Sequence, residues 1–82
     1  MPAIIFKDSS YKQLKKLNKV EKNKVSKKLL ALASDPYAGK ALQGGYKGLY
    51  SLRAWPYRII YEISKDSIVI FSIAHRQGSY KK

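Results

Sequence analysis

The sequence of 82 residues contains no cysteine, which excludes a disulfide framework and a thiolate metal site. Its single histidine, His75, excludes a metal site built from several histidines. No phosphate-binding loop of the Walker or dinucleotide type is present. No apolar run approaches the roughly 18 residues that a membrane span needs. The apolar segment before Lys7 is too short for a signal peptide core. We therefore expect a cytoplasmic protein with no metal, no cofactor and no membrane association.

Acidic residues are also scarce. Five Asp and Glu stand against 17 Lys and Arg, which leaves a net charge of +12. Such a charge favours partners that are nucleic acids, acidic proteins or anionic membrane surfaces, and it does not determine the fold. The length predicts one small domain over residues 1–82, and an apolar content of 45% is enough for a modest core.

The N-terminal half predicts a strand followed by two helical segments. Ala3–Lys7 is β-branched and aromatic, as strands are. Residues 8–10 (Asp-Ser-Ser) are good helix N-caps, and residues 18–19 mark a break between the helical segments. The second helix runs over Val20–Ser34 and ends before Pro36, because proline disfavours a helical conformation in the residue before it. The two segments form an antiparallel hairpin or one bent helix. Their apolar stripes are Tyr11, Leu14 and Leu17, then Val25, Leu29, Leu32 and Ala33.

The C-terminal half predicts a loop and three strands. Residues 36–48 contain a proline and four of the five glycines, which is typical of a loop. Leu49–Ala54, Tyr57–Ile63 and Ser67–Ala74 are joined by hairpin-length connections and should form an antiparallel meander. The order β-α-α-β-β-β predicts an α+β fold with the helices packed on one sheet face. The tyrosines expected in the core are Tyr11, Tyr50, Tyr57 and Tyr61.

The two kinds of basic residue are segregated along the chain. Ten of the fourteen lysines lie in the first forty residues, whereas Arg53, Arg58 and Arg76 all lie in the strand half. The lysines form either a solvated helix face or a field that attracts polyanions. The arginines are either surface residues paired with Glu62 and Asp66, or an anion site on the uncovered face, since the guanidinium fork matches phosphate. Trp55, next to a proline, serves either turn packing or base stacking.

The C-terminal segment brings an imidazole, a guanidinium and a phenol together in His75, Arg76 and Tyr80. Cleavage of an RNA backbone removes a proton from the 2′-hydroxyl, neutralises charge on the phosphorus centre and protonates the leaving oxygen. Histidine or tyrosine can serve the proton steps, and arginine can neutralise the charge. On its own, His75 would more often be a structural histidine; within this segment it becomes a catalytic candidate.

Several motifs together resemble the RelE/ParE superfamily of toxins. They are the SDP that ends the helices, the LQGGYKG loop, LYSLRAWPYRIIYEI over residues 49–63, and IVIFSIAHRQGSYKK over residues 68–82. The YRIIY strand and the HRxxxY ending carry the most specificity. The resemblance extends over nearly the whole chain and implies a RelE-like toxin of a type II toxin–antitoxin pair.

The resemblance also implies roles for single residues. Arg58 and Arg76 would hold and neutralise the scissile phosphate, Tyr80 would stack on or activate the substrate nucleotide, and His75 would transfer a proton. Arg53 matches one of two basic positions in its strand.

One expected basic position departs from the family pattern. The second basic position of that strand is Ser51 here, so one expected lysine is missing, and Lys47 in the preceding loop is a candidate to replace it.

The RelE-like resemblance implies a metal-independent endoribonuclease that cuts mRNA on the ribosome. Its partners would be the ribosome, mRNA and an acidic antitoxin that folds on binding. Two alternatives stay open. One is a ParE-like inhibitor of DNA gyrase, and the other is a non-catalytic basic module that binds nucleic acid.

Overall fold

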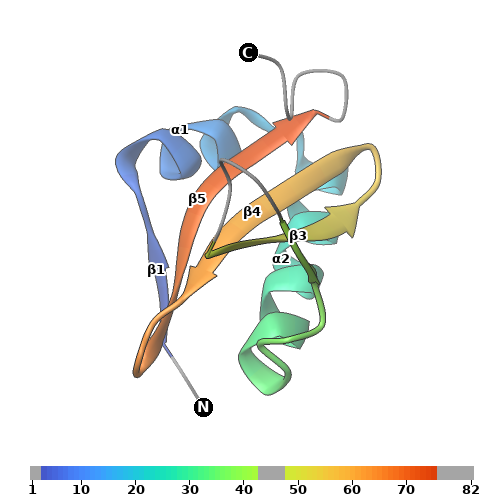
Figure 1. The fold of residues 1–82 in the computed structure, drawn as a ribbon. Coiled ribbons are helices and arrows are strands. Elements are labelled where there is room, and N and C mark those ends of the chain that lie inside the picture. The colour runs from blue at the N-terminus through green and yellow to red at the C-terminus, as the bar shows by residue number, and fades with distance from the viewer. Residues whose placement is uncertain (1–2, 43–47, 76–82) are drawn as a thin grey trace.

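The computed structural model describes residues 3–42 and 48–75 as two layers, a sheet and a pair of helices. The strands lie in the order β1-β5-β4-β3-β2, with β1 parallel to β5 and the other neighbours antiparallel. Both helices cover the same sheet face, so no helix of residues 3–42 and 48–75 lies over the face toward the viewer in Figure 1. The predicted α+β class is thus confirmed. The elements are β1 (Ala3–Phe6), α1 (Asp8–Lys16), α2 (Lys19–Ser34), β2 (Lys40–Ala41), β3 (Leu49–Ala54), β4 (Tyr57–Ile63) and β5 (Ser67–His75).

Helix α1 begins earlier than its capping residues predict. Lys7 occupies the N-cap position and makes no side-chain cap, so the N-cap role predicted for residues 8–10 is wrong. The buried Ser10 Oγ instead lies 2.8 Å from the carbonyl oxygens of both Lys7 and Ile70 and shares its one hydrogen between them, which fastens the helix to β5. Tyr11 is 52% exposed, so its expected place in the core is also wrong. The residue turned toward the sheet is Ser10, because its short side chain lets the helix backbone approach β5.

Helix α2 is separated from α1 at the predicted break. The Asn18 side chain accepts a hydrogen bond from the Glu21 N–H at 2.9 Å, which satisfies one of the free donors of the first turn. The helix ends at Ser34 as expected. All four residues of its predicted apolar stripe are buried, and three of them, Val25, Leu29 and Leu32, belong to the core cluster with residues of the covered sheet face.

The predicted loop over residues 36–48 contains a short strand, β2, that the sequence does not predict. Lys40 pairs with Ser51 of β3, and Ala41 pairs with Tyr50. Gly39 places this strand, because its N–H donates to the Tyr61 hydroxyl at 3.0 Å. A Cβ at Gly39 would overlap that hydroxyl and lie 2.9 Å from the Ser51 carbonyl oxygen. A strand of two residues is too short to show alternation, which explains the error.

Strand alternation in β4 separates the core from the uncovered face. Ile59 and Tyr61 are fully buried against the helices, and Tyr57 packs at the margin of the same core. The Tyr61 hydroxyl donates to the Pro36 carbonyl at 2.8 Å, which ties the core to the segment before β2. Because side chains alternate along a strand, Arg58 points to the opposite, uncovered face.

Candidate functional site

Two arginines lie directly opposite each other on the uncovered face. Arg53 of β3 and Arg58 of β4 are partners in the register of the hairpin, and Arg58 also faces Ala74 of β5. Cβ atoms of such cross-strand pairs are about 4.5–5.5 Å apart, and like charges in this arrangement oppose folding. An anion bound between the two guanidinium groups would remove that penalty. The structure therefore brings together two of the three arginines that the sequence singled out.

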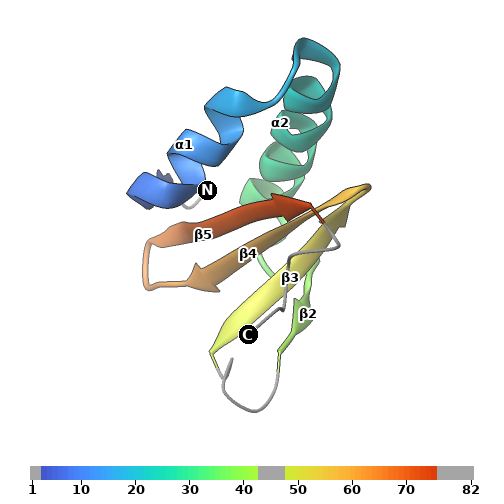
Figure 2. The ribbon, with the colours of Figure 1, turned by 90° about the horizontal axis from the view of Figure 1, so that it is seen from above.

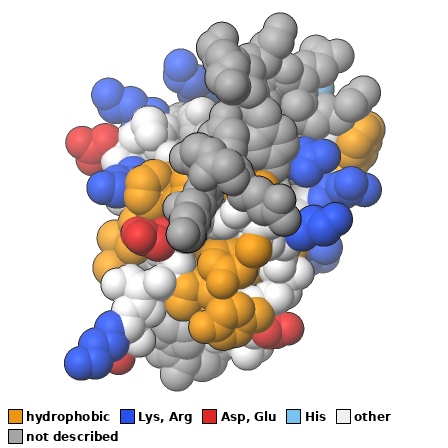
Figure 3. All heavy atoms as spheres, viewed as in Figure 1, with side chains coloured by type: hydrophobic (Ala, Val, Ile, Leu, Met, Phe, Trp, Pro, Cys, Tyr) orange, Lys and Arg blue, Asp and Glu red, His pale blue; other side chains and the backbone are white. Residues whose placement is uncertain are grey.

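Glu62 and Asp66, the acidic residues considered as partners of the arginines, lie away from this pair. Glu62 is opposite Leu49, at the far end of the hairpin from Arg58, and Asp66 lies in the turn before β5. Lys and Arg side chains gather at the margin beside the β3–β4 turn in Figure 3. The arrangement therefore favours the anion-site interpretation of the arginines.

A pocket of about 420 Å³ opens beside the arginine pair, and we call it the edge pocket. No acidic residue of the described chain lines it. Its cations come from α2 and from three strands, so the fold and not one segment assembles them. The lining residues are Lys28, Ala38, Gly39, Lys40, Leu42, Ser51, Leu52, Arg53 and Arg58.

Ser51 contributes a buried hydroxyl to the edge pocket. The residue is 7% exposed, and its Oγ has no hydrogen-bond partner within the described part of the chain. A buried polar atom left unsatisfied costs about 1–3 kcal/mol. A hydroxyl can donate to an anionic oxygen, so a phosphate in the pocket would satisfy this group.

Lys40 and Lys28 are site residues that sequence reasoning missed. Lys40 is the cross-strand partner of Ser51, so it places an ammonium next to the position where the family pattern has a lysine. Lys28 reaches the same pocket from α2. The pairing of Lys40 depends on the register of a two-residue strand, for which the sequence holds no signal. Lys47, the predicted replacement, lies outside the described residues.

His75 lies on the other side of the sheet from the arginine pair. It is the cross-strand partner of Tyr57, and the two rings meet edge to face with centroids 5.6 Å apart. The Tyr57 hydroxyl donates to the Glu21 carboxylate at 2.8 Å, and this hydrogen bond raises the pKa of Tyr57 above 10.0. The structure therefore places His75 with a tyrosine and a glutamate, and apart from Arg58.

Two predicted catalytic residues, Arg76 and Tyr80, lie outside the described residues. Their roles stay predictions. Among residues 3–42 and 48–75, no three His, Cys, Asp or Glu side chains are grouped to hold a metal ion. No helix in those ranges is long and apolar enough to cross a membrane.

Comparisons with known proteins identify a family and a set of similar structures. A family model described as the ParE toxin of type II toxin–antitoxin system, parDE, matches residues 4–80. A search of curated proteins finds no match.

Solved structures of toxins superpose over nearly the whole chain. The RelBE2 toxin–antitoxin complex from Mycobacterium tuberculosis matches with a TM-score of 0.83 and 27% identity, covering 93% of this chain and 100% of that one. The intact RelBE complex of E. coli gives 0.78 and 22%, covering 92% and 96%. A YoeB/ParE toxin from Agrobacterium tumefaciens gives 0.79 and 17%, covering 89% and 96%. The last two show similarity of fold.

Proposed function

The chain belongs to the ParE toxin family of type II toxin–antitoxin systems, and we propose, from the arginine pair of its uncovered face and its similarity to RelE structures, that it is a RelE-like endoribonuclease. In this proposal residues 1–82 form one toxin domain, which acts in the cytoplasm and cuts mRNA on the ribosome without a metal. The observation that carries the proposal is the opposed pair Arg53 and Arg58 beside the edge pocket.

The arginine pair would serve the electrostatic part of RNA cleavage. Attack of the 2′-oxygen on phosphorus adds negative charge to the phosphate oxygens. Fixed cations aimed at that charge stabilise the transition state, which is often the largest single contribution to catalysis. Arg58 would bind the scissile phosphate together with Arg76, while Arg53 and Lys40 would keep the phosphate in position. Ser51 would donate a hydrogen bond from the pocket wall.

The proton steps would fall to His75 and Tyr80. Histidine titrates near neutrality and suits either step. Tyr57 holds the His75 ring at the end of β5. The scissile phosphate would therefore have to reach that end of the strand for His75 to act. Tyr80 would then serve the remaining proton step or stack on the nucleotide.

The second partner would be an acidic antitoxin. Two of the similar structures are toxin–antitoxin complexes, and the net charge of +12 attracts an acidic chain. We propose that such a segment covers or distorts the arginine site.

Inhibition of DNA gyrase is the second candidate, because the matching family model carries the ParE name. A gyrase inhibitor acts by binding and needs no group that transfers protons or neutralises a scissile phosphate. The opposed arginines and the HRxxxY ending favour the ribonuclease.

Primer extension on mRNA incubated with the purified protein distinguishes these candidates. We expect cuts when ribosomes are present and none when they are absent. A gyrase supercoiling assay with the same preparation should be unaffected. Intact mRNA together with loss of supercoiling would replace the proposal with gyrase inhibition. If the mRNA stays intact and supercoiling is also unaffected, the remaining candidate is a basic module that binds nucleic acid.

A further inference from the structure

A second pocket, of about 410 Å³, lies between α2 and the β3–β4 turn, and we call it the turn pocket. Three of its five lining residues are cations, and no acidic residue of the described chain is among them. It shares Lys28 and Arg53 with the edge pocket, so the two pockets adjoin. The lining residues are Lys24, Lys28, Arg53, Ala54 and Trp55.

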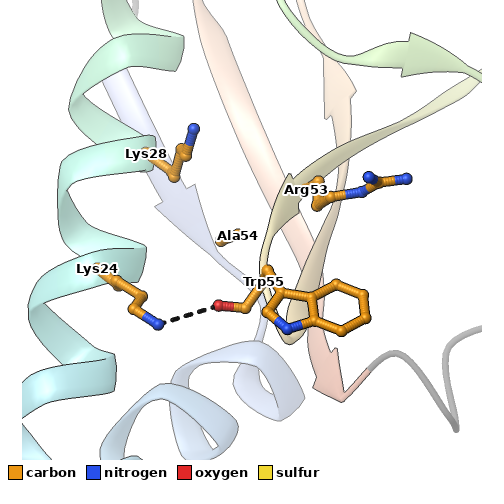
Figure 4. A pocket seen from close by; sticks show the side chains of 5 residues that line it. All are labelled: Lys24, Lys28, Arg53, Ala54 and Trp55. Carbon is orange, nitrogen blue, oxygen red and sulfur yellow. Dashed lines mark hydrogen bonds between the residues drawn. The ribbon is translucent and has the colours of Figure 1, made fainter.

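The turn pocket is held in shape by a contact between the turn and the helix. The Lys24 ammonium donates to the Trp55 carbonyl at 3.3 Å (Figure 4). Figure 4 also shows the side chains of Arg53 and Trp55 projecting in the same direction from the hairpin, away from α2, while the two lysines extend from the helix toward the hairpin. A cation and an aromatic ring are thus presented side by side.

Trp55 leaves a large aromatic surface in contact with solvent. The residue is 54% exposed, although tryptophan is highly buried on average. Solvent-accessible aromatic rings among basic residues are the usual means of binding single-stranded nucleic acid, because the bases stack on the rings while the cations follow the backbone. The interpretation of Trp55 as turn packing alone does not account for this exposure.

We propose that the turn pocket binds a nucleotide of single-stranded RNA next to the scissile phosphate. Its base stacks on Trp55 and its phosphate lies on Arg53, while Lys28 adds positive charge from α2. Arg53 separates this nucleotide from the phosphate on Arg58, which gives the substrate a defined path around the β3 edge. The inference rests on the proposed function for the choice of RNA as the ligand.

The sole tryptophan of the chain makes the proposal directly measurable. Trp55 fluorescence can be titrated with a short, unstructured oligoribonucleotide in the absence of ribosomes, where we expect no cleavage. We expect saturable quenching by the oligoribonucleotide. An abasic ribose-phosphate chain of equal length should bind with little quenching, because it has phosphates and no bases.

Two substitutions, Lys28→Gln and Trp55→Leu, test whether these residues bind the RNA. Lys28→Gln should weaken binding and reduce the slope of log affinity against log salt concentration by about 0.7, the value for one phosphate of a single strand. Lys22→Gln, an exposed lysine of α2 outside both pockets, is the matched control and should change neither. In an anisotropy assay with labelled RNA, Trp55→Leu should weaken binding by roughly 5- to 150-fold, the range of base stacking on an aromatic side chain.

Equal quenching by the abasic chain would overturn the proposal. So would quenching by polyglutamate with none by RNA, since that would mark a surface for an acidic protein. The titration needs neither ribosomes nor cleavage, so its outcome is separate from that of primer extension. Cuts on the ribosome without quenching would refute the turn pocket alone. Quenching without cuts would refute the ribonuclease and leave the RNA site standing.

Discussion

The two faces of the β3–β4 hairpin carry side chains of different chemistry, although these side chains belong to neighbouring residues. On the uncovered face, Arg53 and Arg58 oppose each other beside a pocket with a buried hydroxyl that has no hydrogen-bond partner among the described residues. On the covered face, one residue away, Tyr57 has a carboxylate and an imidazole as partners. One face therefore carries like charges and a hydroxyl that an anion can bind, and the other carries groups that bind one another. We propose that phosphate binding belongs to the first face, and that the second face supports the fold and holds His75 at the end of β5.

Substitution of Arg58 should have the largest effect on function. We expect Arg58→Gln to reduce cleavage of mRNA about 100-fold, as loss of a group that stabilises transition-state charge does. Expression of the variant should no longer inhibit growth, and its circular dichroism spectrum and melting should show a folded protein. A folded variant that inhibits growth like the wild type would remove Arg58 from the site.

Arg53→Gln tests the repulsion between the two arginines. Removing one of two opposed like charges should raise the free energy of unfolding by about 0.5 kcal/mol while reducing cleavage. Urea unfolding measures the first effect, and an unchanged or lower stability would show that the pair carries no strain.

On the covered face, Tyr61→Phe should affect stability most. The change leaves the Gly39 N–H and the Pro36 carbonyl without this partner, which should cost about 1–3 kcal/mol in urea unfolding. Because Gly39 precedes Lys40, we also expect weaker RNA binding at the edge pocket. Unchanged stability would show that the segment before β2 is not held by this hydroxyl.

Lys40→Gln should have a smaller effect, confined to binding. With one phosphate fewer neutralised, RNA binding should weaken several-fold at low salt, and the slope of log affinity against log salt concentration should fall by about 0.7. Lys65→Gln, in the exposed turn before β5, removes the same charge away from the pocket and is the control. Equal effects of the two substitutions would assign Lys40 to the general charge and not to the site.

Tyr57→Phe should have the smallest effect, visible at high pH. The pKa of Tyr57 is raised in the fold, first by its hydrogen bond to Glu21, so its stabilising contribution is complete below 10.0 and is lost as the pH rises through the folded pKa. The variant should therefore lose less stability between about pH 9 and pH 11 than the wild type. The variant still loses some stability at alkaline pH, because the pKa of Tyr61 is also raised, mainly by burial. Identical alkaline curves would show that Glu21 and Tyr57 are not coupled.

The sequence predicts the elements whose apolar residues recur at a regular spacing. It does not predict the elements that are fixed only by the register of strand pairing. It predicts the apolar stripe on α2, and it predicts β3 and β4 with their observed bounds. It does not predict the short strand β2, or the place of Lys40, because pairing over two residues leaves no pattern. Position in the sequence groups His75 with the arginines, but alternation in the sheet places it beside Tyr57.

A single-turnover cleavage assay on ribosomes carrying mRNA tests the contrast between the two faces most directly. The wild type would be compared with Arg58→Gln and Tyr57→Phe, which change adjacent residues that point to opposite faces. We predict that Arg58→Gln loses about 100-fold in rate, while Tyr57→Phe stays within a few-fold of the wild type. Equal losses in both variants, or a larger loss in Tyr57→Phe, would contradict the proposed binding of the scissile phosphate on the uncovered face.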